Sequence, residues 1–468
     1  MAEVTRLLSG AAIVVGSYVG LLSVGDADHR RRLLAAAVVF WLICVVATAW
    51  VARSSGRIRR PVITVALLAL AVQLPGVLTP PRSSSDAWRY VWDGRVTLSG
   101  TSPYRYVPLD DHLARLRDPI LFPGLTSGQR SGVTTSPVQA NSDALLHLAK
   151  ADARTVINRP GVPTIYPPVA QLWFAGVAAL TPWSLGTLGL QIASALLAIA
   201  VAAALAAWLL RHGRNPREAL WWAWFPTVIF EAGNGAHVDI LVAALVLGAV
   251  LAMKTRPGRT ASAWVAGLLL GAAAAVKLTP LVLLPAFMPL RNNGIGRNGI
   301  RRSWQVPVAA VGTLVASYAP HVLIVGGLVL GYLPGYLVEE GGGNRGGLLR
   351  LVVPESLLTP AMFVAMAAVA VWAVRTTRLD APQHAALVLF GSLLLVTTPS
   401  YPWYSLPLVV LAVLAGRLEW LAVPVAVQVA YAVALAPPVR TIGYAMAAAV
   451  VIGVAIWRQV RSSRPTPV

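Results

Sequence analysis

The chain has 468 residues, of which 57% are hydrophobic and 12% are charged, and its net charge is +20. Soluble domains carry about 25% charged residues, so this composition excludes an ordinary soluble protein and indicates one that crosses a membrane many times. The basic residues stand in short clusters between apolar runs, which argues against nucleic-acid binding, and the single Cys44 excludes an intramolecular disulfide.

The apolar runs predict an all-α fold. A helix of about 20 apolar residues crosses the hydrocarbon core, and shorter runs suffice where protein surrounds them, so we predict a polytopic transmembrane bundle of about 12–14 spans. The candidate spans are 7–25, 33–52, 62–79, 184–210, 217–232, 238–254, 261–276, 278–290, 305–327, 357–374, 384–398, 403–416, 419–436 and 440–457. They divide the chain into N-terminal spans (1–79), a long loop (80–183) and a transmembrane bundle (184–468).

Basic clusters predict the orientation, because cytoplasmic loops of membrane proteins are enriched in Lys and Arg. The clusters that fall on one side are RSSGRIRR, RHGRNPR, KTRPGR, RNNGIGRNGIRR, RTTR and the C-terminal RQVRSSR, while only HRRR (29–32) falls on the other. We therefore expect a multi-pass protein of the cell membrane whose residues 80–183 and 328–356 face the periplasm or the cell exterior, together with most of the acidic residues.

The outer segment 80–183 is too long for a simple connection, because loops beyond about 15 residues usually have structure or function of their own. Its beginning, SSSDAWRYVWDGR, has the spacing of an amphipathic helix lying in the membrane interface. The expected apolar face carries Trp88, Val91, Trp92 and Val96, and the opposite face carries Asp86, Tyr90, Asp93 and Thr97. Residues 127–143 are polar, and 163–180 are predicted to form a half-inserted or surface helix that begins at the diproline 167–168.

Two carboxylates of this first helix are candidates for chemistry. Asp86 stands where an aspartate caps a helix, and it is equally a candidate general base for an incoming hydroxyl at the membrane boundary. Asp93 lies about 10 Å further along the helix, too far for the two to share a proton. It is a candidate for binding or orienting a substrate, or else a structural partner of Arg89 or Arg95.

The segment EAGNGAHVD places His237 and Asp239 at the outer end of a span, close to Glu231. Histidine is a common metal ligand and acid–base group, but one H-x-D offers too few ligands for a metal site. Ionisable residues near membrane spans are functional candidates, and a purely structural polar network is the alternative.

Further candidates lie at the predicted outer boundary. Lys277 is either a snorkelling lysine or a point charge for a phosphate, and His321 raises the same question. Arg345 stands in the glycine-rich EEGGGNRGG, which is either a flexible loop or a backbone that approaches a ligand closely. Tyr401 and Trp403, in TPSYPWYSLP, belong to an aromatic belt or stack on sugar or lipid.

These residues carry a family resemblance. SDAWRYVWDGRVTLSGTSPYRYVP, followed by INRPGVPTIYPPVAQLWF, resembles the first outer loop of the C-type (GT-C) glycosyltransferases. More narrowly, it is similar to bacterial polyprenyl-phosphomannose-dependent mannosyltransferases. GNGAHVDILVAAL, AAAVKLTPLVLLP and YPWYSLPL resemble later landmarks of that group, so the resemblance is spread over most of residues 80–410.

The resemblance implies an inverting membrane transferase of GT-C fold. Its donor would be a sugar, foremost mannose, on a polyprenyl phosphate, and its acceptor a hydroxyl of a glycan or glycolipid. The family's catalytic aspartate falls on Asp86. Candidate substrate contacts are then Asp93, Tyr90, Tyr166, His237, Asp239, Lys277, His321, Arg345, Tyr401 and Trp403. Asp86 is followed by AW rather than completing the D-x-D pair of some relatives, so a divalent metal stays open as a cofactor but is not indicated. The expected partners include membrane lipid and exclude nucleic acid.

A transporter or flippase of lipid-linked sugars is the main alternative, because it too would place polar residues within its spans. Transporters often show internal repeats with matched broken helices, which are not evident here. The long outer segment favours an enzyme. Donor sugars other than mannose, such as glucose or arabinose, stay open because a few hydrogen bonds separate epimers.

Overall fold

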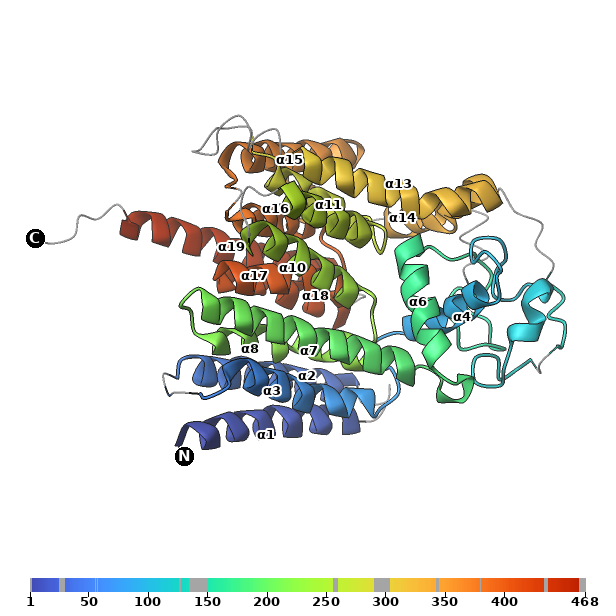
Figure 1. Cartoon of the computed structure of the whole chain (residues 1–468), viewed down its shortest axis with the longest axis horizontal. Coiled ribbons are helices and arrows are strands. Elements are labelled where there is room, and N and C mark those ends of the chain that lie inside the picture. Colours follow the sequence, from blue (N-terminus) through green and yellow to red (C-terminus); the bar gives the residue numbers. More distant parts are fainter. Residues whose placement is uncertain are drawn as a thin grey trace, which may run out of the picture. The chain divides into compact units, whose positions relative to one another are not determined.

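The computed structural model describes residues 2–24, 30–54, 56, 58–125, 128–133, 150–255, 260–289, 304–341, 345–378, 380–432 and 437–462. Within these ranges the chain is helical and has no β-strand, which confirms the predicted all-α fold (Figure 1). The α-helices are α1 (Ala2–Ser23), α2 (Arg30–Ala52), α3 (Pro61–Val77), α4 (Asp86–Leu98), α6 (Pro168–Leu180), α7 (Leu188–Arg211), α8 (Leu220–Ala223), α9 (Pro226–Ile229), α10 (Asp239–Thr255), α11 (Thr260–Ala274), α13 (Gln305–Val325), α14 (Leu333–Gly341), α15 (Glu355–Thr376), α16 (Pro382–Thr397), α17 (Leu406–Ala415), α18 (Ala422–Ala432) and α19 (Pro437–Ser462). The 3-10 helices are Asp111–Leu116, Trp183–Leu185, Pro216–Ala219, Thr279–Phe287, Gly326–Leu330, Leu349–Leu351, Pro402–Ser405 and Leu418–Leu421, and Phe230–Asn234 is a π-helical turn.

Several described helices are long and apolar enough to cross a membrane. They are Glu3–Ser23, Arg32–Ala52, Leu188–Arg211, Gln305–Glu339, Glu355–Thr376 and Pro438–Ser462. The pair Pro226–Asn234 and Asp239–Met253, bent by 117°, adds a further candidate. The molecule is therefore a multi-pass membrane protein. Other predicted spans coincide with shorter apolar helices, so the number of about 12–14 crossings stays a prediction.

Two predicted spans differ from continuous helices. The run 217–232 is divided among a 3-10 turn, α8, α9 and the π-helical turn, and it meets α10 at a sharp bend. The run 278–290 forms the 3-10 helix Thr279–Phe287, which contains Pro285. Proline removes a backbone donor and disfavours a continuing α-helix, so an apolar run interrupted by proline need not form one straight span.

The chain folds as two compact units. The first comprises Met1–Leu245, Leu268–Thr279 and Ala309–Gly342, and the second comprises Val246–Gly267, Pro280–Val308 and Gly343–Val468. In the second unit α15 packs on α16, α16 on α17, and α18 on α19. The predicted division into 1–79, 80–183 and 184–468 concerns membrane topology and stays a prediction.

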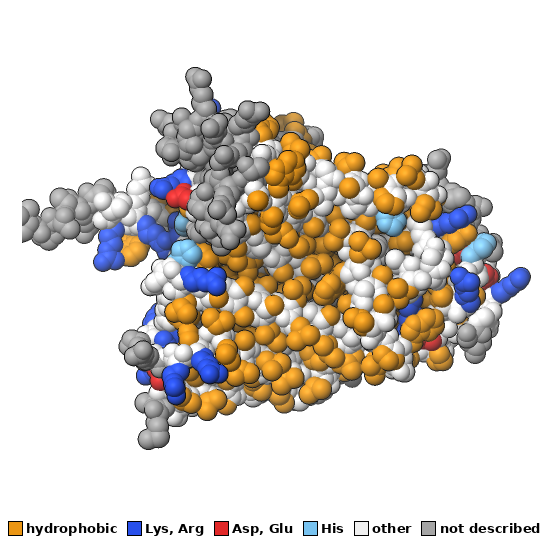
Figure 2. Space-filling view, in the orientation of Figure 1, with side chains coloured by type: hydrophobic (Ala, Val, Ile, Leu, Met, Phe, Trp, Pro, Cys, Tyr) orange, Lys and Arg blue, Asp and Glu red, His pale blue; other side chains and the backbone are white. Residues whose placement is uncertain are grey.

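In the first unit α1, α2 and α3 lie side by side, and α7 packs on α3 (Figure 1). Over these helices Figure 2 shows a largely hydrophobic face, with basic side chains gathered at the end where the N-terminus lies. Exposed apolar residues on the four helices include Leu8, Leu42, Leu67 and Leu196. An apolar surface of this extent suits contact with lipid chains.

The predicted amphipathic helix is α4, but its tryptophan face packs on protein rather than on lipid. Trp92 is 1% exposed and lies edge-on to Phe122, with 4.9 Å between ring centroids. Helix α6, which begins at the predicted diproline, covers another side of α4. A Cβ at Gly94 would lie 2.5 Å from the backbone oxygen of Phe174, so the two helices approach more closely than a larger residue would allow. The residues after α4 fold back over it, a long-range packing that helical periodicity does not reveal.

Candidate active site

The sharp bend between the π-helical turn and α10 lies in the first unit and is anchored to the end of α3. Gln73 accepts a hydrogen bond from the Gly233 amide (2.8 Å), and the Asn234 side chain donates to the Pro80 carbonyl (2.9 Å). Asn234 also accepts from the Arg82 amide (3.0 Å). The Gln191 side chain of α7 donates to the Thr79 carbonyl (2.8 Å). These buried side-chain amides satisfy backbone groups at the bend and after α3, and they hold residues 79–82 against the turn.

Asp86 is the first residue of α4, not its cap. The N-cap is Ser85, whose side chain makes no capping bond, and the Asp86 amide donates to the Ser84 hydroxyl (3.1 Å). The Asp86 carboxylate is therefore available for side-chain contacts. It stands at the N-terminal end of α4, where backbone amides point outward.

Side chains from distant parts of the first unit surround the Asp86 carboxylate. Asn158 donates to Oδ1 (2.5 Å), and the Tyr166 hydroxyl donates to Oδ2 at 3.4 Å. His237 Nε2 lies 3.8 Å from Oδ2. The Asp86 side chain is 15% exposed. One oxygen is thus firmly held and the other has only long contacts, which leaves it able to accept a proton from a further group.

His237 lies behind Asp86 and is fully buried. Its Nδ1 is 2.8 Å from the Glu231 carboxylate, and its Nε2 is 2.9 Å from the Ser84 hydroxyl. Ser83 donates to the same Glu231 carboxylate (3.3 Å). Asp239, two residues on, belongs to a different pair, because Lys277 Nζ lies 2.8 and 3.0 Å from its two carboxylate oxygens. The side chain of Lys277 is 21% exposed, so a cation reaches the surface at this pair.

Asp93 is enclosed by partners. Arg89 donates to it at 2.9 Å and Thr164 at 2.5 Å, and Gln171 adds a longer contact at 3.4 Å. Arg89 also donates to the carbonyls of residues 159 and 162. Of the two ion-pair partners considered for Asp93, Arg89 and Arg95, the structure shows the pair with Arg89. This pair joins α4 to the segment 158–171, which carries Asn158 and Tyr166.

Two tyrosines complete the wall around Asp86. Tyr90 stacks on Phe174 with 4.4 Å between ring centroids and lies edge-on to Tyr166 at 4.9 Å. Burial raises the pKa of Tyr90 well above its usual value. The same cause, with the nearby Asp86 charge, raises the pKa of Tyr166. Both phenols therefore stay protonated, and Tyr166 acts towards Asp86 only as a donor.

The other predicted site residues lie elsewhere. His321 of α13 is edge-on to Tyr104 at 5.1 Å, and Tyr104 donates to the Tyr166 carbonyl (2.9 Å), which connects α13 to the wall of the site. Arg345, Tyr401 and Trp403 belong to the second unit. There Tyr401 stacks on Trp403 with 4.9 Å between centroids, within an aromatic cluster that also contains Tyr404 and Tyr431.

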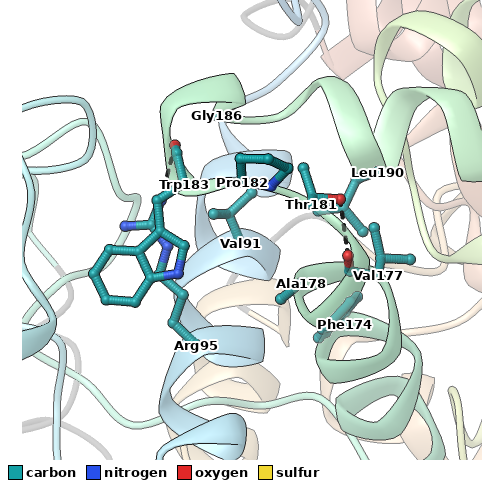
Figure 3. A pocket seen from close by; sticks show the side chains of 10 residues that line it. All are labelled: Val91, Arg95, Phe174, Val177, Ala178, Thr181, Pro182, Trp183, Gly186 and Leu190. Atoms are coloured by element: carbon teal, nitrogen blue, oxygen red, sulfur yellow. Dashed lines mark hydrogen bonds between the residues drawn. The ribbon is translucent and has the colours of Figure 1, made fainter.

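A small cleft lies on the other side of α4 and does not include these groups. Figure 3 shows the Arg95 guanidinium against the Trp183 ring, 4.4 Å from its centroid, beside apolar side chains of α6 and α7. Arg95 also pairs with Asp118. This arrangement ties the outer segment to the start of α7 and brings no nucleophile or base together.

Sequence reasoning did not identify Asn158 or Ser84. Asn158 stands in the INRPG segment that carried the family resemblance, but its contact with Asp86 spans 72 residues of chain. Among the residues that the structure describes, no three His, Cys, Asp or Glu side chains are grouped as a metal site requires.

Comparison with known proteins yields a family match. The model of glycosyltransferase family 87 matches residues 164–400, slightly more than half of the chain. The matched range includes Tyr166, His237, Asp239 and Lys277, whereas Asp86 precedes it. No curated protein and no solved structure matches the chain.

Proposed function

Because this chain belongs to glycosyltransferase family 87, a family of GT-C membrane enzymes that use polyprenol-phosphate sugars, we propose that it transfers mannose from a polyprenyl phosphate to a hydroxyl of a glycan or glycolipid. Transfer would take place on the periplasmic or extracellular face with inversion, and Asp86 would be the general base. Family membership makes the protein an enzyme, so the transporter reading is set aside.

The observation that supports this proposal is the hydrogen bonding and exposure of the Asp86 carboxylate. It lies just after the apolar helix α3, one oxygen is fixed by Asn158, and the other has only long contacts on a side chain that is 15% exposed. A general base must be ionised, oriented and reachable by the hydroxyl whose proton it takes. Among the carboxylates around the bend before α10, Asp239 is paired with Lys277 and Glu231 with His237.

The reaction requires a single displacement. The acceptor oxygen would attack the anomeric carbon while the bond from that carbon to the phosphate oxygen breaks, and Asp86 would take the hydroxyl proton. One displacement inverts the anomeric configuration. The departing phosphate takes the bonding electron pair and is already a good leaving group, so a cation to bind it matters more than an acid to protonate it.

Lys277 is the candidate for that cation. Its ammonium is bound to Asp239 and its side chain is 21% exposed, so a phosphate could share it from the open side. A lysine ammonium is a compact point charge suited to a phosphate. The lipid tail of the donor would remain in the bilayer, which places its sugar at the boundary where α3 ends and α4 begins.

The test is a transfer assay with the purified full chain. Labelled polyprenyl-phosphate mannose, glucose and arabinose would be offered with a panel of lipid-linked and glycan acceptors. Transfer of mannose by wild type, with an Asp86→Asn loss of about 10²-fold or more, is the expected result because a positioned base contributes roughly that much. Asp380→Asn, at an exposed ion pair with Arg378, is the matched control. Near-normal turnover by Asp86→Asn would refute the assigned base, and transfer of a different sugar would refute mannose.

A further inference from the structure

Glu231 and His237 form a buried acid–imidazole pair whose role is not explained by a base at Asp86 alone. Glu231 is 1% exposed and His237 is 0% exposed. The 2.8 Å contact of Nδ1 with the carboxylate lies on one side of the ring, and the opposite nitrogen faces Ser84 and Asp86. Burying a pair of ionisable groups costs free energy, so a functional role would explain why this pair lies next to the Asp86 carboxylate.

The contacts favour a proton on one of the two ring nitrogens. An ionised carboxylate can only accept, so Glu231 favours a proton on Nδ1. Nε2 of the neutral ring is then an acceptor. The Ser84 oxygen accepts from the Asp86 amide, so its hydroxyl proton is free to point towards Nε2. The unprotonated nitrogen thus lies 3.8 Å from the Asp86 oxygen that has only long contacts.

The backbone is strained in a way that places this ring. Residues Phe230–Asn234 form a π-helical turn, and Ala236 adopts a positive φ of 51°, which is unfavourable for a residue with a Cβ. A Cβ at Gly235 would lie 2.6 Å from His237 Nδ1. The His237 amide donates to the Glu231 carbonyl (2.9 Å), which closes the turn. Strain of this kind persists where the surrounding structure holds it, often at functional sites.

We propose that the Glu231–His237 pair is the proton acceptor that returns Asp86 to its carboxylate form after each transfer. This rests on the proposed function, in which Asp86 first takes the proton of the acceptor hydroxyl. The Ser84 hydroxyl then turns away from Nε2, and a small rotation of the Asp86 carboxyl brings its O–H to the lone pair of that nitrogen. The O–H bond breaks, an N–H bond forms with the ring lone pair, and the resulting imidazolium is paired with the Glu231 carboxylate.

This step gives the transfer a direction. While the product occupies the site, a proton on Asp86 could be returned to the new glycosidic oxygen, as in the reverse reaction. A proton on His237 is separated from that oxygen by the Asp86 carboxylate. After the product leaves, the proton passes back through Asp86 to water on its exposed side. Glu231 and His237 are positioning and relay residues, because neither touches a substrate in this scheme.

Charged groups around the ring make the proposal sensitive to pH. His237 is faced by Glu231 from its own turn, by Asp86 from α4, and by Asp239, which Lys277 neutralises. Tyr18 lies within electrostatic range of both Glu231 and Arg82. Removing the charge of Glu231 therefore weakens the ring as a proton acceptor without changing the other groups.

The test uses the full chain in lipid nanodiscs, polyprenyl-phosphate mannose as donor and octyl mannoside as acceptor probe. Glu231→Gln keeps the size of the side chain. It should lower kcat about tenfold or more, the low end for proton-transfer groups, and shift the acid limb of the kcat–pH profile to lower pH. KM for the donor should change less than about threefold, since no ground-state contact is removed. His237→Gln should lower kcat similarly and lose that acid limb. Glu355→Gln and His212→Gln, at exposed sites away from the bend before α10, are matched controls.

Several results would overturn the inference. The inference is wrong if Glu231→Gln and His237→Gln both have the kcat and the pH profile of wild type. It is also wrong if Glu231→Gln has a lower kcat but an unshifted acid limb, because a merely structural role of Glu231 predicts that result. If thermal unfolding shows that Glu231→Gln is not folded, the kcat–pH profile of His237→Gln is the test. An acid limb like that of wild type in this variant would overturn the inference. An active Asp86→Asn enzyme would overturn both the proposed base and this relay, whereas an inactive Asp86→Asn with a wild-type Glu231→Gln would overturn the relay alone.

Discussion

The two carboxylates of α4 lie two helical turns apart in opposite environments. Asp93 is 2% exposed and accepts from Arg89, Thr164 and Gln171, whereas Asp86 has one firm bond, to Asn158, and an oxygen with only long contacts. A carboxylate whose acceptor sites are filled by fixed donors holds a structure together. A carboxylate that is oriented but incompletely bonded is available for chemistry. Similar residues at similar places in a sequence are therefore distinguished by their bonding.

Removing Asp93 should produce the largest effect on stability. Asp93→Ala leaves Arg89 charged and buried, and breaking one partner of a buried ion pair costs about 3–5 kcal/mol. Thermal unfolding of the detergent-purified protein would measure the loss against Asp380→Asn as the surface control. A wild-type melting temperature for Asp93→Ala would contradict the structural role and return Asp93 to the candidates for substrate binding.

Asn158 should affect activity more than stability. Asn158→Ala removes the bond that orients Asp86, and a misplaced catalytic group costs about 10- to 100-fold in rate. The kcat should fall while the melting temperature stays close to that of wild type, because the Arg89–Asp93 ion pair is intact. Asp152→Asn, in the same outer segment but paired with Arg154, is the control. Unchanged turnover in Asn158→Ala would show that Asp86 does not depend on this bond.

The smallest expected effect is a local pH dependence in the outer segment. Bonds from the Ser131 amide and hydroxyl, the Gly132 amide and Arg117 lower the pKa of Asp111 below its usual 3.8. A lowered folded-state pKa means that the contribution is present above the unfolded pKa and lost as pH falls through the folded one. Hydrogen exchange at Ser131 and Gly132 should therefore be faster in Asp111→Asn than in wild type near neutral pH. The difference should shrink as both proteins are taken to acid pH; a constant difference would contradict this assignment.

The sequence predicted the helical fold and a helix beginning near Asp86, because apolar length and helical periodicity are local properties. It did not predict that α4 is covered by protein, since residues about 80 positions away supply Phe174 and Tyr166. His237 and Asp239 were considered together as an H-x-D pair, yet the bend separates them into contacts with Glu231 and with Lys277. Side-chain pairings of this kind depend on the tertiary fold, which helical periodicity cannot supply.

The most direct test of the difference between the two carboxylates is the kcat of Asp86→Asn and Asp93→Asn, each normalised to folded protein and measured with the same polyprenyl-phosphate mannose. The bonding of the two groups predicts that Asp86→Asn loses about 10²-fold or more, as expected for a general base. It predicts that the Asp93→Asn molecules that fold retain activity within about tenfold, since their base is unchanged. Equal losses in the two variants, or a larger loss in Asp93→Asn, would contradict the assignment of Asp86 as the base.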